Sequence, residues 1–169
     1  MSSTAEPGAR SAAVLTVSDS VVGGTRADGS GPAVAQALQQ AGYRVVAREA
    51  VPDERNHIEN ALVGLCEQAR LVVTTGGTGV AARDVTPEAT QSICDREVPG
   101  IAERMRAEGS RKTPLAALSR AICATRGTSL VLNLPGSTKG ATESLAAVID
   151  LLGHALDLLA GKTEHKSAR

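Results

Sequence analysis

The sequence predicts a three-layer α/β domain, in which helices cover both faces of a mostly parallel sheet. Two observations predict this fold class. Short apolar runs alternate with segments whose apolar residues recur every three or four positions, which is the pattern of repeated strand–helix units. Aromatic residues are also nearly absent, since Tyr43 is the only residue among Phe, Trp and Tyr. The core must therefore be aliphatic, as in a buried parallel sheet.

The first half of the chain gives two such units. An apolar strand over 12–17 precedes a helix over 32–41, which a Gly-Pro pair opens and a glycine closes. A second strand over 44–51 precedes a helix with one buried face. That face consists of Ile58, Ala61, Leu62, Leu65 and Ala69, spaced by three and four residues.

The second half continues the alternation. The expected elements are, in order, strand 71–75, helices 87–95 and 99–108, strand 128–133, and a helix whose apolar stripe runs over 145–159. Gly161 is expected to stop the last helix. The segment 109–126 has no clear periodicity, so no element is assigned to it.

Length and composition limit the function classes. The 169 residues fit one domain, over 12–161, with a disordered lead over 1–11 and a flexible charged tail over 162–169. Lys+Arg and Asp+Glu both number 18, which argues against a nucleic-acid or anionic-membrane partner. No apolar run reaches membrane-spanning length. Three cysteines and three histidines without metal spacing argue against disulfides or zinc and fit a reducing cytoplasm.

The most informative segment is TTGGTGVAARDVTPEA, over 74–89. After the apolar strand it contains a glycine turn at Gly76, Gly77 and Gly79, the charged pair Arg83-Asp84, and the helix-start signal Thr86-Pro87. Thr86 is expected as the N-cap. Such a turn lets backbone N–H groups approach an anionic ligand. It matches neither the P-loop nor the GxGxxG pattern, and a plain strand-to-helix turn is the alternative.

Polar residues also follow the other strands. Ser18 and Asp19 follow the first strand, Asp53 follows the second, and a Pro-Gly-Ser-Thr-Lys segment over 135–139 follows the strand near 133. In an open parallel sheet these ends share one edge, where ligands bind. Carboxylates, hydroxyls, a glycine turn and a lysine together suit a phosphate-bearing ligand with a magnesium ion. No GxSxG motif or evident nucleophile–base pair indicates a hydrolase.

Some of these residues have simpler interpretations. Asp53 could cap the helix that follows it, and Asp19 and Asp28 suit turns. Glu103 and Arg106 could form a surface ion pair on one helix face. Arg120, in the tripeptide Leu-Ser-Arg, is ambiguous when it is taken alone.

Seven sequence segments, taken together and in this order, are distinctive: LTVSDS (15–20), DGSGP (28–32), VPDE (51–54), TTGGTGVAARDVTPEAT (74–90), VPGIAERM (98–105), TPLAALSRAIC (113–123) and LVLNLPGSTKGATE (130–143). In these segments the chain resembles the molybdenum-cofactor biosynthesis family of Mog- and MoaB-type proteins, which includes the G domain of gephyrin. The similarity spans nearly the whole chain, and the long glycine motif is highly specific.

The resemblance implies a three-layer α/β domain, usually a trimer, that binds molybdopterin. It further implies adenylylation of molybdopterin with Mg-ATP, which gives adenylyl-molybdopterin and pyrophosphate. Asp53 would help place the magnesium ion and the nucleotide, and Asp84 would hold the pterin or orient the reacting phosphate. The other implied binding residues are Ser18, Asp19, Thr75, Gly76, Gly77, Thr78, Gly79, Glu88, Ser119, Pro135, Gly136, Ser137 and Lys139.

Two other functions stay open on the sequence. One is a noncatalytic molybdopterin-binding or carrier protein, which Mg-ATP-dependent turnover would distinguish from the transferase. The other is a nucleotide pyrophosphate hydrolase of the competence-damage type, against which the LSR and NLPGS motifs argue. A molybdate-insertase partner is expected from the family, whereas no residue indicates it.

Overall fold

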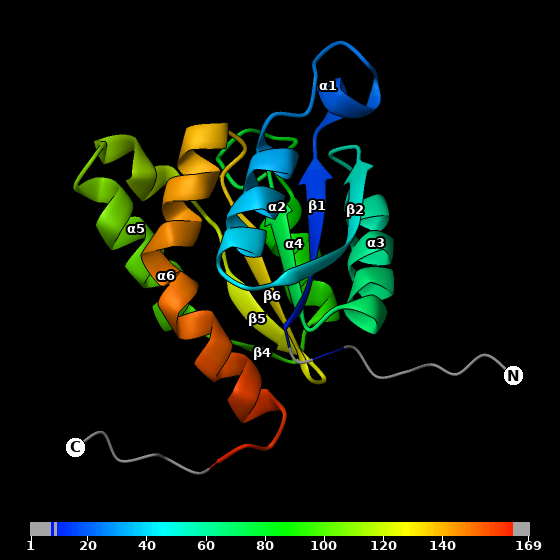
Figure 1. Ribbon diagram of the computed structural model, residues 1–169. Helices are drawn as coiled ribbons and strands as arrows, with labels where there is room; N and C mark the ends of the chain where they lie inside the picture. Colours follow the sequence, from blue (N-terminus) through cyan, green and yellow to red (C-terminus); the bar gives the residue numbers. More distant parts are fainter. Residues whose placement is uncertain (1–7, 9, 164–169) are drawn as a thin grey trace, which may run out of the picture.

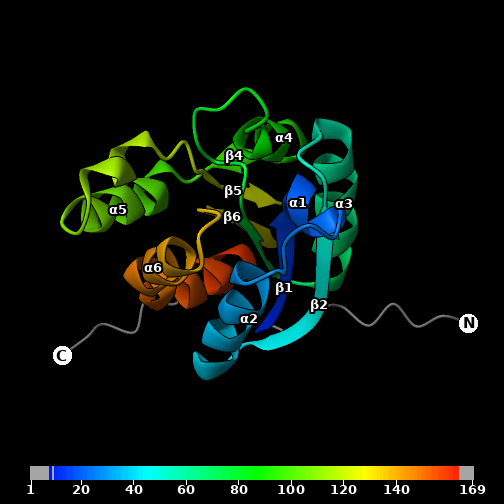
Figure 2. The ribbon, with the colours of Figure 1, turned by 90° about the horizontal axis from the view of Figure 1, so that it is seen from above.

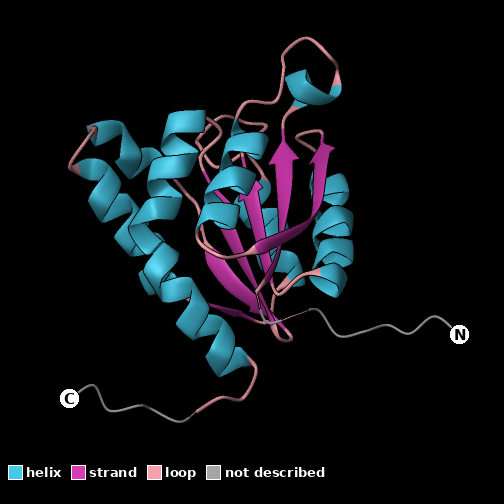
Figure 3. Ribbon diagram, viewed as in Figure 1, coloured by secondary structure: helices cyan, strands magenta, loops and turns pink. Residues whose placement is uncertain are grey.

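The computed structural model describes residue 8 and residues 10–163. The predicted disordered lead and flexible tail lie largely outside these residues. A six-stranded sheet passes through the middle of the molecule in the order β2-β1-β3-β6-β5-β4, and helices cover both of its faces (Figure 1; Figure 3). None of the helices in the described residues is long and apolar enough to cross a membrane.

The sheet is mostly parallel, as predicted. Its strands are β1 (Ser11–Val17), β2 (Arg44–Val51), β3 (Leu71–Thr75), β4 (Arg96–Glu97), β5 (Cys123–Arg126) and β6 (Ser129–Leu134). β2, β1, β3 and β6 pair in parallel, whereas β5 runs antiparallel to both β6 and β4.

Helices form the two outer layers. They are α1 (Asp19–Val22), α2 (Ser30–Gln40), α3 (Arg55–Gln68), α4 (Thr86–Ile93), α5 (Pro99–Ser110), the 3₁₀ helix η1 (Pro114–Leu118) and α6 (Thr138–Leu159). Seen from above, α2, α5 and α6 cover one face of the sheet, and α3 and α4 cover the other (Figure 2). This arrangement confirms the three-layer α/β prediction.

The core is aliphatic on both faces. Along β1, Ala12 and Val14 pack into the cluster under α2, α5 and α6, whereas Ala13 and Leu15 pack under α3. This alternation is the two-residue period of a strand that is buried on both sides. The strands at the centre of the sheet are thereby fixed in register, and their carboxyl ends are held side by side.

Tyr43, the single aromatic residue, lies in the α2–α6 cluster and is 4% exposed. Arg10 Nη1 donates to the Tyr43 hydroxyl at 3.2 Å, and its guanidinium carbon lies 5.6 Å from the ring centroid. The contact joins the residue before β1 to the start of β2, at the end of the sheet opposite the glycine turn.

The sequence predictions missed four short elements. They are α1, β4, β5 and η1, of which η1 and β5 lie in the unassigned segment 109–126. α6 also begins at Thr138, well before its apolar stripe, because the Ser137 hydroxyl accepts a hydrogen bond from the Gly140 amide and caps the helix there. These elements are too short or too polar at the start for periodicity to detect.

Candidate functional site

The polar residues after β1, β2, β3 and β6 meet at one edge of the sheet, as predicted. Gly76 lies at the centre of this edge. Its φ is +104°, and a Cβ added there would lie 2.2 Å from the Val17 carbonyl oxygen. A Cβ at Gly136 would in turn lie 3.3 Å from the Gly76 Cα. The ends of β1, β3 and β6 therefore contact one another through main-chain atoms, which only glycine at position 76 permits.

Gly77 approaches the first turn of α4 just as closely. Its φ is +68°, and an added Cβ would lie 2.3 Å from Thr86 Oγ1 and 3.3 Å from Asp53 Oδ1. The two side chains therefore flank the same point of the glycine turn. Any side chain at position 77 would collide with Thr86 and crowd the carboxylate of Asp53.

The predicted N-cap role of Thr86 is wrong. Val85 is the cap residue and offers no side-chain cap bond, while Thr86 is the first residue of α4. The Thr86 amide donates to the Gly77 carbonyl at 3.1 Å, which places the residue inside the first turn. Its hydroxyl is then buried beneath Gly77 and has no hydrogen-bond partner among the described residues. Tertiary contact with the glycine turn has replaced the local cap.

Asp19 and Asp53 are joined reciprocally. The Asp53 amide donates to Asp19 Oδ1 and the Asp19 amide donates to Asp53 Oδ2, each at 2.9 Å. Asp53 is therefore not the cap of α3, since Glu54 occupies the cap position there without a side-chain bond. The two carboxylates are held beside each other by backbone amides from two different strand ends.

Arg83 distinguishes the two carboxylates. Its Nε donates to Asp19 Oδ2 at 2.6 Å and its Nη2 donates to Asp19 Oδ1 at 3.0 Å. These bonds, with the amide bond from Asp53, lower the pKa of Asp19. Burial raises the pKa of Asp53, and the nearby charges of Asp19 and Asp84 add to that rise. Asp53 Oδ1 accepts no hydrogen bond within the described part of the chain, so it is the oxygen open to a ligand.

Asp84 ends a small loop over 79–84, called here the 79–84 loop. The Ala81 amide donates to Asp84 Oδ2 and the Asp84 amide donates to the Ala81 carbonyl, both at 3.0 Å. A Cβ at Gly79 would lie 2.8 Å from Asp84 Oδ2. The carboxylate is therefore folded back over its own loop, close to the glycine turn.

A cavity of about 740 Å³ opens beside the glycine turn. Of the residues that the sequence indicated, those that line it are Gly77, Thr78, Gly79, Asp84, Ser119, Pro135, Gly136 and Ser137. The remaining ones, which do not line it, are Ser18, Asp19, Asp53, Thr75, Gly76, Glu88 and Lys139. Asp19 and Asp53 do not line the cavity but adjoin it at Gly77, whose added Cβ would lie 3.3 Å from Asp53 Oδ1, so the site has two parts that meet at Gly77.

Several indicated residues act within the protein instead of facing the cavity. The Thr75 hydroxyl donates to the Pro135 carbonyl at 2.8 Å and joins the ends of β3 and β6. The Ser18 hydroxyl accepts from the Val21 amide and caps α1. Asp28 accepts from the Thr16 hydroxyl and the Gly31 amide, as the turn interpretation predicted. Lys139 is exposed in the first turn of α6.

Sequence reasoning missed one wall of the cavity. The end of α5, η1 and the first turns of α6 form this wall, and its lining includes Lys112, Leu115, Leu118, Glu143 and Ala147. Leu115 and Leu118 are 69% and 54% exposed. The Thr-Pro pair that caps η1 is the local signal that could have located it, because the Thr113 hydroxyl accepts from the Leu115 amide.

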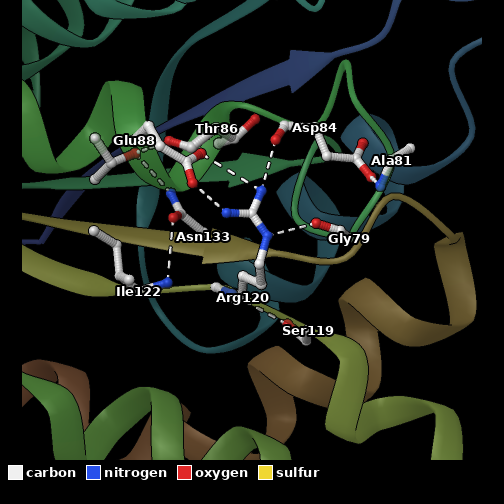
Figure 4. Close-up of polar contacts among 11 residues, drawn as sticks. Gly79, Ala81, Asp84, Thr86, Glu88, Ser119, Arg120, Ile122 and Asn133 are labelled. Atoms are coloured by element: carbon white, nitrogen blue, oxygen red, sulfur yellow. Dashed lines mark hydrogen bonds and ion pairs between the residues drawn. The ribbon is translucent and has the colours of Figure 1, made fainter.

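Arg120 is the most connected side chain at the site (Figure 4). Its Nε donates to the Gly79 carbonyl at 2.7 Å and its Nη2 donates to the Asp84 carbonyl at 2.6 Å. Nη1 forms an ion pair with Glu88 in the first turn of α4. Burial raises the pKa of Glu88, but its hydrogen bond to Arg120 and the charge of that residue outweigh burial, and the pKa is lowered.

Asn133 and Arg106 form hydrogen bonds with the segment around Arg120. The Asn133 amide group donates to the Thr74 and Thr90 hydroxyls, and its oxygen accepts from the Ile122 amide. Arg106 does not pair with Glu103, because its Nη1 donates to the Ser119 and Ala121 carbonyls instead. Both side chains fix the segment that carries Arg120.

The cysteines offer no activated thiol. Burial raises the pKa of Cys66 to about 11 and those of Cys94 and Cys123 to about 12. All three are free thiols in the structure. In the described residues there is also no cluster of three or more His, Cys, Asp or Glu side chains that could hold a metal ion.

Comparison with known proteins gives consistent matches. A family described as "Probable molybdopterin binding domain" matches residues 13–154. A molybdopterin adenylyltransferase of Helicobacter pylori is 41% identical over 152 residues, which cover 88% of this chain and 86% of the relative. The molybdopterin adenylyltransferase of Escherichia coli K12 is 40% identical over 145 residues, covering 83% of this chain and 74% of the relative.

The fold has close structural neighbours as well. The crystal structure of the molybdopterin biosynthesis enzyme MoaB from Thermus thermophilus superposes with a TM-score of 0.84. The two chains are 50% identical, and the match covers 89% of this chain and 96% of that one.

Proposed function

This chain belongs to the family of probable molybdopterin binding domains, and on that premise we propose that it is a molybdopterin adenylyltransferase. The names of relatives about 40% identical support this activity. One observation within the chain carries the proposal. Gly77 and Asp84 line the cavity, and a Cβ at Gly77 would lie 3.3 Å from Asp53 Oδ1, so the carboxylate pair of Asp19 and Asp53 adjoins the cavity at the glycine turn.

The two parts of the site suit two substrates. The cavity of about 740 Å³ is large enough for a pterin, and the N-terminus of the long helix α6 opens beside it at Ser137. A helix N-terminus favours a phosphate group, and we assign the pterin phosphate to it. The nucleotide triphosphate is assigned to the side of Asp53. The two phosphates that react would then meet near Gly77 and Asp84.

Magnesium fits the carboxylate side. Mg²⁺ in proteins commonly takes one or two carboxylates together with substrate phosphates and water, not a full cage of side chains. Asp53 has an open Oδ1, whereas the Asp19 carboxylate is already bound by Arg83. Asp53 is therefore the side chain that would hold the ion. When bound, Mg²⁺ would neutralise charge on the phosphates of the nucleotide.

The reaction needs no nucleophile from the protein. The terminal phosphate of molybdopterin attacks the α-phosphate of ATP, a new P–O–P bond forms, and the bond to pyrophosphate breaks. The chain contributes by binding and orienting the two substrates, because nucleotidyl transfer depends mostly on position and charge. Asp84 orients the reacting groups at the junction. The raised pKa values of the three cysteines agree with a mechanism that uses no thiolate.

Pyrophosphate release from Mg-ATP, measured with and without molybdopterin, tests this function. We expect pterin-dependent release together with an adenylylated pterin on chromatography. Asp84→Asn should lose turnover, while Asp157→Asn, a change near the far end of α6, should retain it. Tight pterin binding without nucleotide turnover would contradict the transferase and indicate a carrier. Release of AMP from ADP-ribose without pterin would indicate a pyrophosphate hydrolase.

The family also suggests how the protein is assembled. We propose that it forms a homotrimer, works in the cytoplasm and passes its product to a molybdate insertase. Three free thiols support a reducing compartment. Light scattering on the purified chain would test the trimer, and a monomer at micromolar concentration would contradict it.

A further inference from the structure

The 79–84 loop leaves the glycine turn and returns to α4 over six residues, and Asp84 ends it. Inside the loop, two hydrogen bonds between Ala81 and Asp84 close its last turn. These local bonds shape the turn, but they do not fix where the loop lies relative to the cavity. That position depends on contacts from outside the loop.

Arg120 supplies contacts at both ends of the loop. Its Nε reaches the Gly79 carbonyl at one end and its Nη2 reaches the Asp84 carbonyl at the other, at 2.7 and 2.6 Å (Figure 4). Its backbone amide donates to the Thr78 carbonyl at 2.8 Å. One residue therefore spans the opening of the loop from the segment that precedes β5.

Glu88 orients the guanidinium for this task. Its carboxylate contacts Nη1 and, at 3.5 Å, Nη2 of Arg120. Since Glu88 lies in the first turn of α4, the ion pair also ties the loop to the helix that follows it. The arginine side chain is 37% exposed and the glutamate 42%, so the pair is only partly screened by water.

The acceptors require the geometry of arginine. Two carbonyls and one carboxylate lie in three directions around one planar group, and a guanidinium offers five N–H donors in a fixed fork. A lysine ammonium would keep the charge but could not hold three acceptors at these places. This requirement separates the contact from an ordinary ion pair between Arg120 and Glu88.

We propose that Arg120 is a positioning residue, which sets the place of the Asp84 carboxylate by holding both ends of the 79–84 loop, and that Glu88 acts through it. The inference rests on the proposed function for its catalytic consequence. Its structural consequence, that Arg120 holds the two ends of a loop whose Arg83 also binds Asp19, stands apart from that function. Glu88 then contributes to the site through Arg120 and not through the nucleotide.

The test compares Arg120→Lys with Arg126→Lys. Arg126 is also half-buried and donates to a backbone carbonyl of α4, that of Ile93, but it does not contact the loop. Amide hydrogen exchange of Ala81 and Asp84 is the first readout. We expect exchange at these amides to rise roughly 10- to 100-fold in Arg120→Lys, as the loss of a charge-assisted hydrogen bond implies. It should stay unchanged in Arg126→Lys.

Turnover is the second readout. In Arg120→Lys we expect kcat to fall by about 10²-fold while KM for ATP stays within about threefold, since displacement of an orienting group acts on the transition state. Glu88→Gln should show a smaller loss of kcat with KM for ATP unchanged. Added guanidinium should partly restore Arg120→Ala but not Asp84→Asn.

Three results would overturn the inference. They are unchanged exchange at Ala81 and Asp84 in Arg120→Lys, faster exchange with unchanged kcat, and an equal effect in Arg126→Lys. If the wild-type chain shows no pterin-dependent turnover, the proposed function fails. The exchange comparison between the two lysine variants then still decides whether Arg120 orders the loop.

Discussion

The contact between Gly77 and Thr86 makes a prediction that does not depend on activity. Gly77→Ala introduces a side chain at a φ of +68°, and its Cβ would lie 2.3 Å from Thr86 Oγ1. The backbone conformation costs about 1–2 kcal/mol for a residue other than glycine. Overpacking against a stiff β-branched side chain adds about 1–3 kcal/mol. We expect a total loss of roughly 2–5 kcal/mol in the free energy of unfolding.

Gly24→Ala is the matched control. Gly24 has a φ of +76°, and no atom lies within 4 Å of the position of its Cβ. This variant should lose only the backbone contribution, about 1–2 kcal/mol. The difference between the two glycine variants therefore isolates the collision with Thr86.

Thr86→Ala removes the other partner of the collision. The Thr86 hydroxyl has no hydrogen-bond partner in the described residues, so its loss offsets the loss of the packed methyl group. The double variant should recover about 1–3 kcal/mol relative to the sum of the single variants.

Urea unfolding at one fixed protein concentration measures these free energies, since association would otherwise shift the midpoint. A Gly77→Ala loss no larger than that of Gly24→Ala would refute the packing argument. Strict additivity in the double variant would refute the pairing of Gly77 with Thr86.

The same edge of the sheet and the core beneath it make three further predictions. Burial raises the pKa of Asp53 above its unfolded value, so the ionised carboxylate costs stability above the folded-state pKa. Asp53→Asn should therefore raise the thermal midpoint at pH 7, and pyrophosphate release should be lost. The increase in the thermal midpoint should shrink as pH falls through the folded-state pKa of Asp53. An unchanged or lower thermal midpoint at pH 7 would contradict this prediction. Asn133→Ala should lower the free energy of unfolding in urea by about 2–4 kcal/mol, because the Ile122 amide loses its acceptor and a buried space opens. A loss below about 1 kcal/mol, the value of one ordinary hydrogen bond, would argue against the hydrogen-bond network of Asn133. The pKa values of about 11 for Cys66 and about 12 for Cys94 and Cys123 predict slow reaction with a thiol reagent at pH 8 until denaturant is added, and fast labelling of the native chain would disprove it.

The fold was largely predictable because its central strands are buried on both faces. The predicted bounds of the strand over 71–75 are those of β3, in which every residue is buried. The bounds of the strand over 44–51 are those of β2, an edge strand without a buried residue, which turn signals at both ends locate. The two-residue β4 and the 3₁₀ helix η1 carry too few residues for any period to appear. Burial of strand residues is a strong sequence signal, whereas short connecting elements follow from tertiary contacts.

The edge of the sheet where the polar residues meet was predictable, but the contacts among their side chains were not. Strand ends with polar residues indicated the edge of the sheet, and the glycine turn lies there. Nothing in the sequence says that Arg83 binds Asp19 or that Arg120 binds Glu88, since these partners are 64 and 32 residues apart. Thr86 shows the same limit, because its local cap signal was overridden by contact with Gly77.

The main-chain contacts among Val17, Gly76 and Gly136 have a thermodynamic consequence for ligand binding. Groups locked by backbone packing have already lost their conformational entropy during folding, so a ligand that contacts them does not have to order them again. The floor of the site should therefore act as a preorganised surface. Adaptation to different ligands would be confined to the η1 wall, where Leu115 and Leu118 are exposed.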